Sequence, residues 1–191
     1  MKEDLEAIVP VAGYSQRMGA WKPEIIYRGI PVLTRVVELA LKHSERVLVV
    51  TGHRQEDALA LLPRDRRVHA LHNEAYSRGM FSSIQCALGA IEAESFLVFM
   101  GDMPEVPDAV VERLKSVVLS SWARPVYKGR PGHPVRIHRR IIPELLALNS
   151  KRGEMRQVLR RHEGVLIDTD HPGVYVDLDT PEDLERLRKL T

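Results

Sequence analysis

The sequence has little cysteine, and this scarcity excludes two kinds of structure. Its one cysteine, Cys86, can form neither an intramolecular disulfide nor a multi-cysteine zinc or iron–sulfur site. Cys86 lies in an apolar stretch with helical spacing, so we expect a small core residue rather than a nucleophile. Aromatic residues make up only 5% of the 191 residues, and aliphatic side chains must therefore build the core.

Long apolar runs are also absent. No apolar segment approaches the roughly 20 residues that a membrane-spanning helix needs, and the first residues lack the pattern of a secretory or transit peptide. No internal repeat or Gly/Ser linker divides the chain. We expect a single domain over residues 1–191, in the cytoplasm and without membrane contact.

The charge is nearly balanced but unevenly distributed. A net charge of +2 gives no indication of nucleic-acid binding, and we expect none. Residues 113–161, however, contain 13 Lys and Arg against two acidic residues, Glu144 and Glu154. This segment forms either a solvated basic face or a surface that attracts an anionic, phosphorylated ligand.

Apolar runs alternate with segments of helical spacing through the first 120 residues. Strands are expected at residues 5–12, 46–51, 67–72 and 96–100, and helices at 31–41, 55–62, 80–91 and 107–119. This alternation predicts an α/β fold with a mostly parallel central sheet and helices on both faces.

The pattern changes after residue 120. Residues 125–128 and 134–138 flank a glycine-containing turn, which predicts a small hairpin-like insertion. The remaining expected elements are helices at 140–148 and 152–162, strands at 165–167 and 174–178, and a last helix that begins at Thr180 with Asp183 in a capping-box position.

The loop after the first predicted strand combines glycines with cations. Gly13 and Gly19 let backbone N–H groups approach an anion closely, and Arg17 and Lys22 add charged donors. The spacing fits neither the P-loop nor the dinucleotide fingerprint. On spacing alone, phosphate binding and a plain surface loop both remain open.

Carboxylates follow two other predicted strands. Asp102 comes just after one of them, and Asp177 and Asp179 lie at the end of another, where they would point the same way. Such carboxylates can hold Mg²⁺ on substrate phosphates, and the alternative is a turn or helix-capping role. Because ligands bind beyond the carboxyl ends of parallel strands, four loops should face one crevice: 13–22, 51–54, 101–104 and 177–180.

At this point the residues resemble a known family. The segment VAGYSQRMGAWK at residues 11–22 resembles the L-A-A-G-x-S-x-R-M-G-x-x-K signature of the nucleotidyltransferases that include molybdenum cofactor cytidylyltransferase. Four further segments are similar to family motifs in the same order: RGMFSS (78–83), GDMP (101–104), GRPGHPV (129–135) and DLDTPEDL (177–184). Five ordered matches are far more specific than any one of them.

The resemblance implies a Rossmann-like nucleotidyltransferase fold and Mg²⁺-dependent transfer of a nucleoside monophosphate from an NTP to a phosphorylated acceptor, with release of pyrophosphate. It implies a molybdopterin-like acceptor, and a molybdoenzyme or its chaperone as a candidate partner. By motif, the residues implied to bind the nucleotide and its triphosphate are Ala12, Gly13, Ser15, Arg17, Gly19 and Lys22, with Arg17, Lys22 and Asp102 serving catalysis. Those implied for the remaining roles are Gly79, Ser82 and Ser83 around the base or ribose, Asp102 with Asp177 or Asp179 on Mg²⁺, and Gly132 and His133 near the acceptor.

The sequence departs from the family pattern at several positions. Pro10 lacks an N–H, so we expect it at a strand end. Val11 and Phe81 are bulkier than the family residues in the same predicted pocket, which leaves the base preference open. Ala12 matches the cytidylyltransferases, whereas Met103 resembles the guanylyltransferase branch, and the other motifs favour CTP over GTP.

Other functions remain as alternatives. The acceptor could be a sugar phosphate or polyol phosphate, since only a few aromatic residues could stack on a pterin: Tyr14, Trp21, Phe81 and Tyr127. A non-catalytic, cofactor-binding chaperone of the same fold is a second alternative. A nicotinamide-dependent oxidoreductase is disfavoured because the glycine fingerprint is absent.

Overall fold

A mixed sheet of eight strands forms the centre of the molecule, in a computed structural model that describes residues 4–14, 19–151 and 154–188. The strands lie in the order β10-β7-β9-β6-β1-β4-β5, with β8 paired to β7, and β2 and β3 form a separate pair. The strands are β1 (Leu5–Pro10), β2 (Ile26–Tyr27), β3 (Ile30–Pro31), β4 (Arg46–Thr51), β5 (Val68–His72), β6 (Ser95–Val98), β7 (Trp122–Tyr127), β8 (Arg130–Pro131), β9 (Val135–His138) and β10 (Gly164–Asp168). The α-helices are α1 (Val32–His43), α2 (Gln55–Ala60), α3 (Met80–Leu88), α4 (Asp108–Ser116), α5 (Ile142–Ala147), α6 (Met155–Leu159) and α7 (Pro181–Arg188), and the 3-10 helices are η2 (Lys22–Glu24), η3 (Tyr76–Arg78), η4 (Arg139–Ile141) and η5 (Pro172–Val174).

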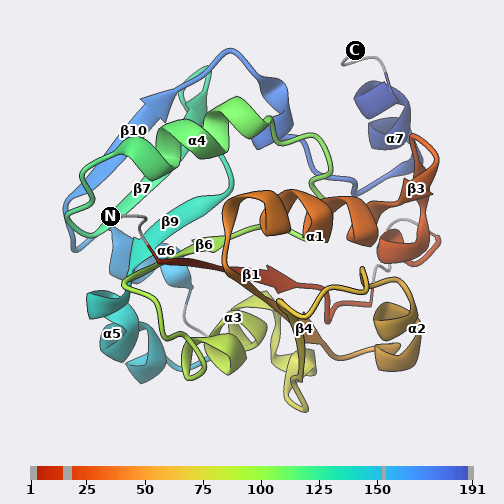
Figure 1. Ribbon diagram of the computed structural model, residues 1–191, viewed down its shortest axis with the longest axis horizontal. Helices are drawn as coiled ribbons and strands as arrows, with labels where there is room; N and C mark the ends of the chain where they lie inside the picture. The colour runs from red at the N-terminus through yellow and green to blue at the C-terminus, as the bar shows by residue number, and fades with distance from the viewer. Residues whose placement is uncertain (1–3, 15–18, 152–153, 189–191) are drawn as a thin grey trace.

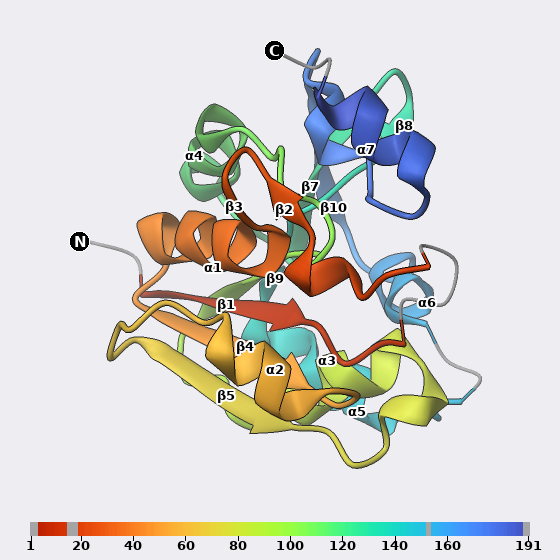
Figure 2. The same cartoon turned by 90° about the vertical axis from the view of Figure 1, so that its right-hand side faces the viewer.

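The inner strands form because their side chains are mostly apolar and lie between two layers of helices. β1 pairs in parallel with β4 and β6, and every residue of β1 is buried. Side chains alternate across a strand, so Ala7 and Val9 pack with α1 and α4 on one face, while Ile8 packs with α3 and α5 on the other. Figure 1 and Figure 2 show these helices on the two faces. The predicted α/β fold with a mostly parallel sheet is confirmed.

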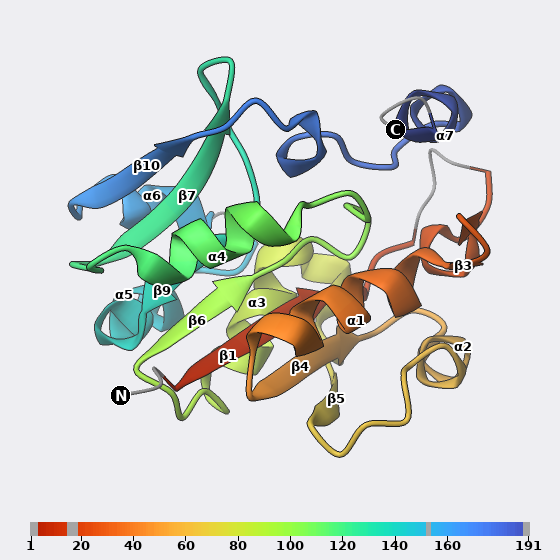
Figure 3. The same ribbon diagram turned by 45° about the horizontal axis from the view of Figure 1, so that its top comes forward.

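β9 runs antiparallel to both of its neighbours, β6 and β7. The element predicted as a small hairpin-like insertion is therefore built into the central sheet. Lys128 and Gly129 form the turn between β7 and β8, and both have the positive φ (48° and 75°) that a two-residue hairpin turn needs. Figure 3 shows the resulting sheet, with β10 and β5 at its opposite edges.

The strand predicted at residues 174–178 is wrong. The chain instead leaves η5 as an irregular extended segment. Its backbone makes single hydrogen bonds to separate loops: the His133 N–H donates to the Val174 oxygen at 2.7 Å, and the Leu178 N–H donates to the Asp102 oxygen at 3.0 Å. Val174 and Leu178 are buried without being part of a ladder, so the apolar residues that suggested a strand reflect burial alone.

Smaller expectations have mixed outcomes. β1 ends at Pro10, as the missing N–H predicts, and not at residue 12. The capping box of α7 is confirmed, since the Thr180 N–H donates to Asp183 Oδ2 at 2.8 Å and the Asp183 N–H donates to Thr180 Oγ1 at 3.3 Å. Cys86 is half-buried beside the core rather than within it. Within the described ranges, no helix is both long and apolar enough to cross a bilayer.

Candidate active site

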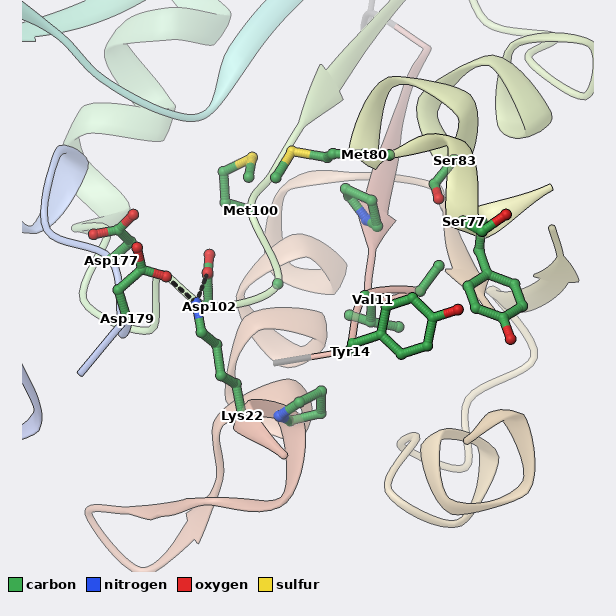
Figure 4. A pocket seen from close by; sticks show the side chains of 17 residues that line it. Val11, Tyr14, Lys22, Ser77, Met80, Ser83, Met100, Asp102, Asp177 and Asp179 are labelled. Atoms are coloured by element: carbon green, nitrogen blue, oxygen red, sulfur yellow. Dashed lines mark hydrogen bonds and ion pairs between the residues drawn. The ribbon is translucent and has the colours of Figure 1, made fainter. Parts of the chain in front are cut away.

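A cavity of about 550 Å³ opens at the carboxyl ends of β1 and β6. Its lining comes from five parts of the chain: residues 10–14, residues 22–23, five residues of the 76–83 segment (Tyr76, Ser77, Gly79, Met80 and Ser83), residues 100–102, and the segment with Asp177 and Asp179. Figure 4 shows the carboxylates and Lys22 on one side of this cavity, and Tyr14, Ser77 and Ser83 on the other. The sheet thus brings residues from opposite ends of the sequence to one edge, as the parallel strands predict.

Close packing of two strand ends places Asp102. A Cβ at Gly101 would lie 2.5 Å from Val11 Cγ1 and 2.8 Å from the Pro10 oxygen, so only glycine fits between β1 and the loop after β6. The hydrogen bond from the Leu178 N–H to the Asp102 oxygen then ties the C-terminal segment to the same loop. The first, fourth and last parts of the lining are therefore held together by these close contacts.

Lys22 lies among the carboxylates. Its Nζ donates to Asp102 Oδ2 at 2.9 Å and also to Asp179 Oδ1, and all three side chains are largely buried. Burial alone would lower the pKa of Lys22, but the charges and hydrogen bonds of Asp102 and Asp179 outweigh it and raise that pKa. The ammonium is therefore charged at neutral pH.

The carboxylates suit a divalent cation. Asp102, Asp177 and Asp179 each offer an oxygen, and these oxygens lie within 4.8 Å of one another. Partial desolvation and the charges of Asp102 and Asp179 raise the pKa of Asp177, as expected for carboxylates that share a site. In the described part of the chain, Asp102 Oδ1 is buried and has no hydrogen-bond partner. Because an unpaired buried oxygen is costly and carboxylate oxygens are ligands for Mg²⁺, these residues fit a hard metal ion.

The glycine and serine residues singled out by motif separate into lining and supporting positions. Ala12, Gly13, Gly79 and Ser83 line the cavity, whereas Gly19 and Ser82 are outside its lining. Ser82 is buried: its hydroxyl donates to the Gly79 oxygen at 2.7 Å and accepts from Asn73 Nδ2 at 2.9 Å. Ser82 therefore shapes the start of α3 rather than contacting a ligand. Arg17 and Ser15 lie outside the described residues.

The structure does not bring His133 or residues 51–54 into the cavity. His133 is half-buried, and its Nδ1 makes a long contact of 3.5 Å with the Val98 oxygen. Burial, together with the nearby charge of Arg124, lowers the pKa of His133 to about 4. The turn at residues 51–54 lies behind the lining because Gly52 is covered by Ala12 and Tyr76.

The depressed pKa of His133 predicts a pH effect on folding. The imidazole takes a proton near pH 6.5 in the unfolded chain but only near pH 4 in the folded one. The part of the unfolding free energy that depends on a neutral His133 is therefore fully present above about pH 6.5. It decreases as the pH falls and is completely lost below about pH 4. From pH 7 to pH 5 we expect this partly accessible residue to cost about 1–2 kcal/mol of unfolding free energy.

Denaturant titrations at several pH values check this effect. His133→Gln should flatten the slope of stability against pH in that window. His69→Gln, at an exposed histidine on β5, is the matched control and should leave the slope unchanged. An equal slope in the wild type and in His133→Gln would contradict the prediction.

Sequence reasoning missed part of the lining, namely Pro23, Tyr76, Ser77, Met80 and Met100. Only Met80 had a signal, since it belongs to the motif at residues 78–83. Of the aromatic residues considered for stacking, Tyr14 alone lines the cavity and is 46% exposed, whereas Trp21 and Phe81 are buried. The centroid of the Tyr14 ring lies 4.9 Å from that of the His53 ring and 5.5 Å from that of the Tyr76 ring. Tyr14 therefore forms an aromatic wall of the cavity that the other two rings support.

Known proteins share this chain's sequence pattern and fold. It is 25% identical to the molybdenum cofactor cytidylyltransferase of Escherichia coli K12 over 94% of this chain and 93% of the relative. It is 28% identical to a probable molybdenum cofactor guanylyltransferase of Trichormus variabilis, over 95% of this chain and 89% of the relative. The crystal structure of Rv0371c from Mycobacterium tuberculosis H37Rv superposes with a TM-score of 0.85 at 24% identity, covering 99% of this chain and 100% of that one.

The family described as the MobA-like NTP transferase domain matches residues 7–165, which is most of the chain and includes the greater part of β1, the loop after β6, and β9. The chain belongs to this family of MobA-like NTP transferase domains and is a nucleotidyltransferase.

Proposed function

We propose that the protein transfers CMP from CTP to a phosphorylated acceptor of the molybdopterin type, in a reaction that needs Mg²⁺ and releases pyrophosphate. One observation carries this proposal: a single cavity has Lys22 and three carboxylates on one side and an accessible tyrosine on the other. Charged groups of this kind bind a metal-bound triphosphate, and an aromatic face binds a flat heterocycle. The E. coli relative, which aligns over almost the whole chain, supports the acceptor and the nucleotide.

The residues of the charged side divide the work. Asp102, with Asp177 or Asp179, would hold Mg²⁺, which supplies charge neutralisation and orientation of phosphate oxygens. The Lys22 ammonium offers three N–H donors, and it exchanges its carboxylate partners for phosphate oxygens when the nucleotide enters. Gly13 lets the chain approach the phosphates without a side chain in the way.

The acceptor needs little activation. A phosphate monoester is largely ionised near neutral pH, so its oxygen can attack the α-phosphorus without a strong base, as the bond to pyrophosphate breaks. The described lining of the cavity contains no histidine, which agrees with this requirement. Positioning and charge compensation then account for most of the rate.

The base preference rests on which variant residues reach the cavity. Met103, which resembles the guanylyltransferase branch, is buried and is outside the cavity lining. Phe81 is also buried and outside the lining, whereas Val11 and Ala12 line the cavity. Ala12, which matches the cytidylyltransferases, therefore lies where a bound nucleotide would contact it, whereas Met103 does not. This difference favours CTP over GTP.

Pyrophosphate release tests the proposal, measured with Mg²⁺ and each NTP, with and without molybdopterin cofactor. We expect release with CTP that depends on the acceptor. Release with GTP instead would transfer the assignment to the guanylyltransferase branch. Release only with a sugar phosphate or polyol phosphate would overturn the acceptor, and no release by a folded protein that binds an NTP would favour a carrier.

A further inference from the structure

The turn after β4 contacts the segment through which the chain leaves β1. A Cβ at Gly52 would lie 2.8 Å from Ala12 Cβ and 2.7 Å from Tyr76 Cβ, so the backbone of the turn lies directly against the cavity wall. The His53 N–H donates to the Ala12 oxygen at 3.1 Å, and the His53 ring backs the Tyr14 ring. This side of the turn therefore fixes the aromatic wall.

Arg54 contacts the segment that carries Lys22. Its Nη1 and Nη2 donate to both carboxylate oxygens of Glu24, at 3.1 and 3.0 Å, and its Nε donates to Asp57 Oδ2 at 2.7 Å. Its guanidinium also lies 4.6 Å from the centroid of the Trp21 ring. Trp21 and Glu24 flank Lys22 in the sequence, so Arg54 holds the chain on both sides of this residue.

The backbone of Arg54 is unusual for an arginine. Its φ of 56° and ψ of 47° are left-handed, a conformation that is unfavourable for an L-residue other than glycine. Such a conformation persists where the surroundings determine it. Ion pairs between exposed groups contribute little to stability because water screens them, so the gain in stability from these pairs is small. The bidentate pair with Glu24 mainly fixes geometry.

We propose that Arg54 is a positioning residue, which fixes the backbone at residues 21–24 and thereby aims Lys22 at the phosphates of the nucleotide. This inference rests on the proposed function. Lys22 reaches Asp102 and Asp179 through a flexible four-carbon stem, so its Nζ is well placed only if its backbone is held. Arg54 is outside the cavity lining and acts through Lys22.

A double-mutant cycle tests this assignment. Arg54→Met should lower kcat/KM for the NTP about 10-fold. Most of this loss should be an increase in KM, because Lys22 binds the triphosphate in the ground state as well as in the transition state. In a Lys22→Met background the same change should lower kcat/KM less than about 2-fold, since the residue being aimed is gone. Arg54→Lys should restore little, because an ammonium cannot pair with both oxygens of Glu24.

A matched control separates this effect from a general effect of removing an arginine. Arg67 makes a comparable bidentate pair with Asp65, at 3.1 and 2.7 Å, on a loop outside the cavity lining. Arg67→Met should leave kcat/KM unchanged. The same double-mutant cycle is then measured by equilibrium dialysis, with the Kd for CTP in the presence of Mg²⁺ as the quantity compared. This measurement does not depend on turnover by the Lys22 variants.

Tryptophan fluorescence gives a readout of the contact itself. Arg54→Met should increase acrylamide quenching of Trp21, one of two tryptophans, with Trp21→Phe identifying its signal. Equal losses in both backgrounds, or unchanged KM, Kd and quenching in an active enzyme, would overturn the assignment of Arg54. Absence of NTP turnover and binding in the wild type would instead overturn the proposed function.

Discussion

Asp102→Asn is expected to lower the rate of nucleotidyl transfer by roughly 10³-fold, because it removes charge where phosphate charge must be compensated. The fold holds Asp102 firmly, since Gly101 packs closely against the end of β1 and the Leu178 N–H donates to the Asp102 carbonyl oxygen. It also pairs with Lys22 and keeps one buried oxygen without a hydrogen-bond partner among the described residues. Asparagine keeps the shape of this side chain, so the loss would measure its charge.

Smaller losses are expected at the other carboxylates of the cluster. Asp179 also pairs with Lys22, whereas Asp177 is exposed, so the expected order of effect is Asp102, then Asp179, then Asp177. Asp168→Asn, at an exposed position on β10, is the matched control and should leave the rate unchanged. The measurement is pyrophosphate release under saturating CTP and acceptor, and a loss below about 10-fold for Asp102→Asn would contradict a central role.

The same variant should not destabilise the fold. Asp102 contributes to raising the pKa of Asp177, which indicates repulsion within the carboxylate cluster. Removing one negative charge relieves this repulsion but weakens the ion pair with Lys22, which keeps Asp179 as a partner, so the melting temperature of Asp102→Asn should stay close to that of the wild type. A large decrease in melting temperature would mean that the lost activity reflects unfolding.

The strands could be predicted because burial on both faces leaves an unmistakable pattern. Continuous apolar runs predicted β4 and the core of β1 and β6, and the parallel arrangement then placed Ala12, Gly13 and Asp102 at one edge. Asp177 and Asp179 lie at the same edge, as predicted, although the strand predicted to carry them does not form. At residues 174–178, single hydrogen bonds to neighbouring loops take the place of a β-ladder. Such bonds produce no periodic pattern in the sequence that could predict them.

The rest of the site depends on contacts that no local pattern encodes. A motif identifies Ser82 and Ser83 equally, yet one hydroxyl supports the backbone and the other faces the cavity. Tyr76 lines the cavity from a short 3-10 helix, which has no apolar periodicity by which the sequence could predict it. Arg54 meets Glu24 across loops, and only the packed fold brings them together.

Arg136→Met is expected to lower the free energy of unfolding by about 3–5 kcal/mol. The concentration of Arg and Lys at residues 113–161 suggested a basic face or an anion-binding surface, but Arg136 belongs to the interior, with none of its surface exposed. It lies on β9, between two buried apolar residues. Its charge is therefore stabilising only if the groups around it satisfy it.

The backbone at the end of α4 provides these groups. Arg136 Nη1 donates to the oxygens of Leu114 and Lys115, both at 2.9 Å, and to the Val117 oxygen at 3.1 Å. Its Nε donates to Ser95 Oγ on β6 at 3.2 Å. The last carbonyls of a helix have no partners within the helix, so the guanidinium caps α4 from inside the core. Methionine fills a similar volume but leaves these buried oxygens without this donor.

Denaturant unfolding of two variants distinguishes this cap from ordinary packing. Arg139→Met is the matched control, because Arg139 donates to the Glu92 oxygen at the exposed surface, and it should change stability by less than about 1 kcal/mol. A loss below about 1 kcal/mol for Arg136→Met would mean that water or a shift of α4 satisfies the carbonyls. A loss of the expected size would mean that one buried charge joins β9, β6 and α4. The antiparallel strand would then depend on that charge for its place beside the strand that leads to Asp102.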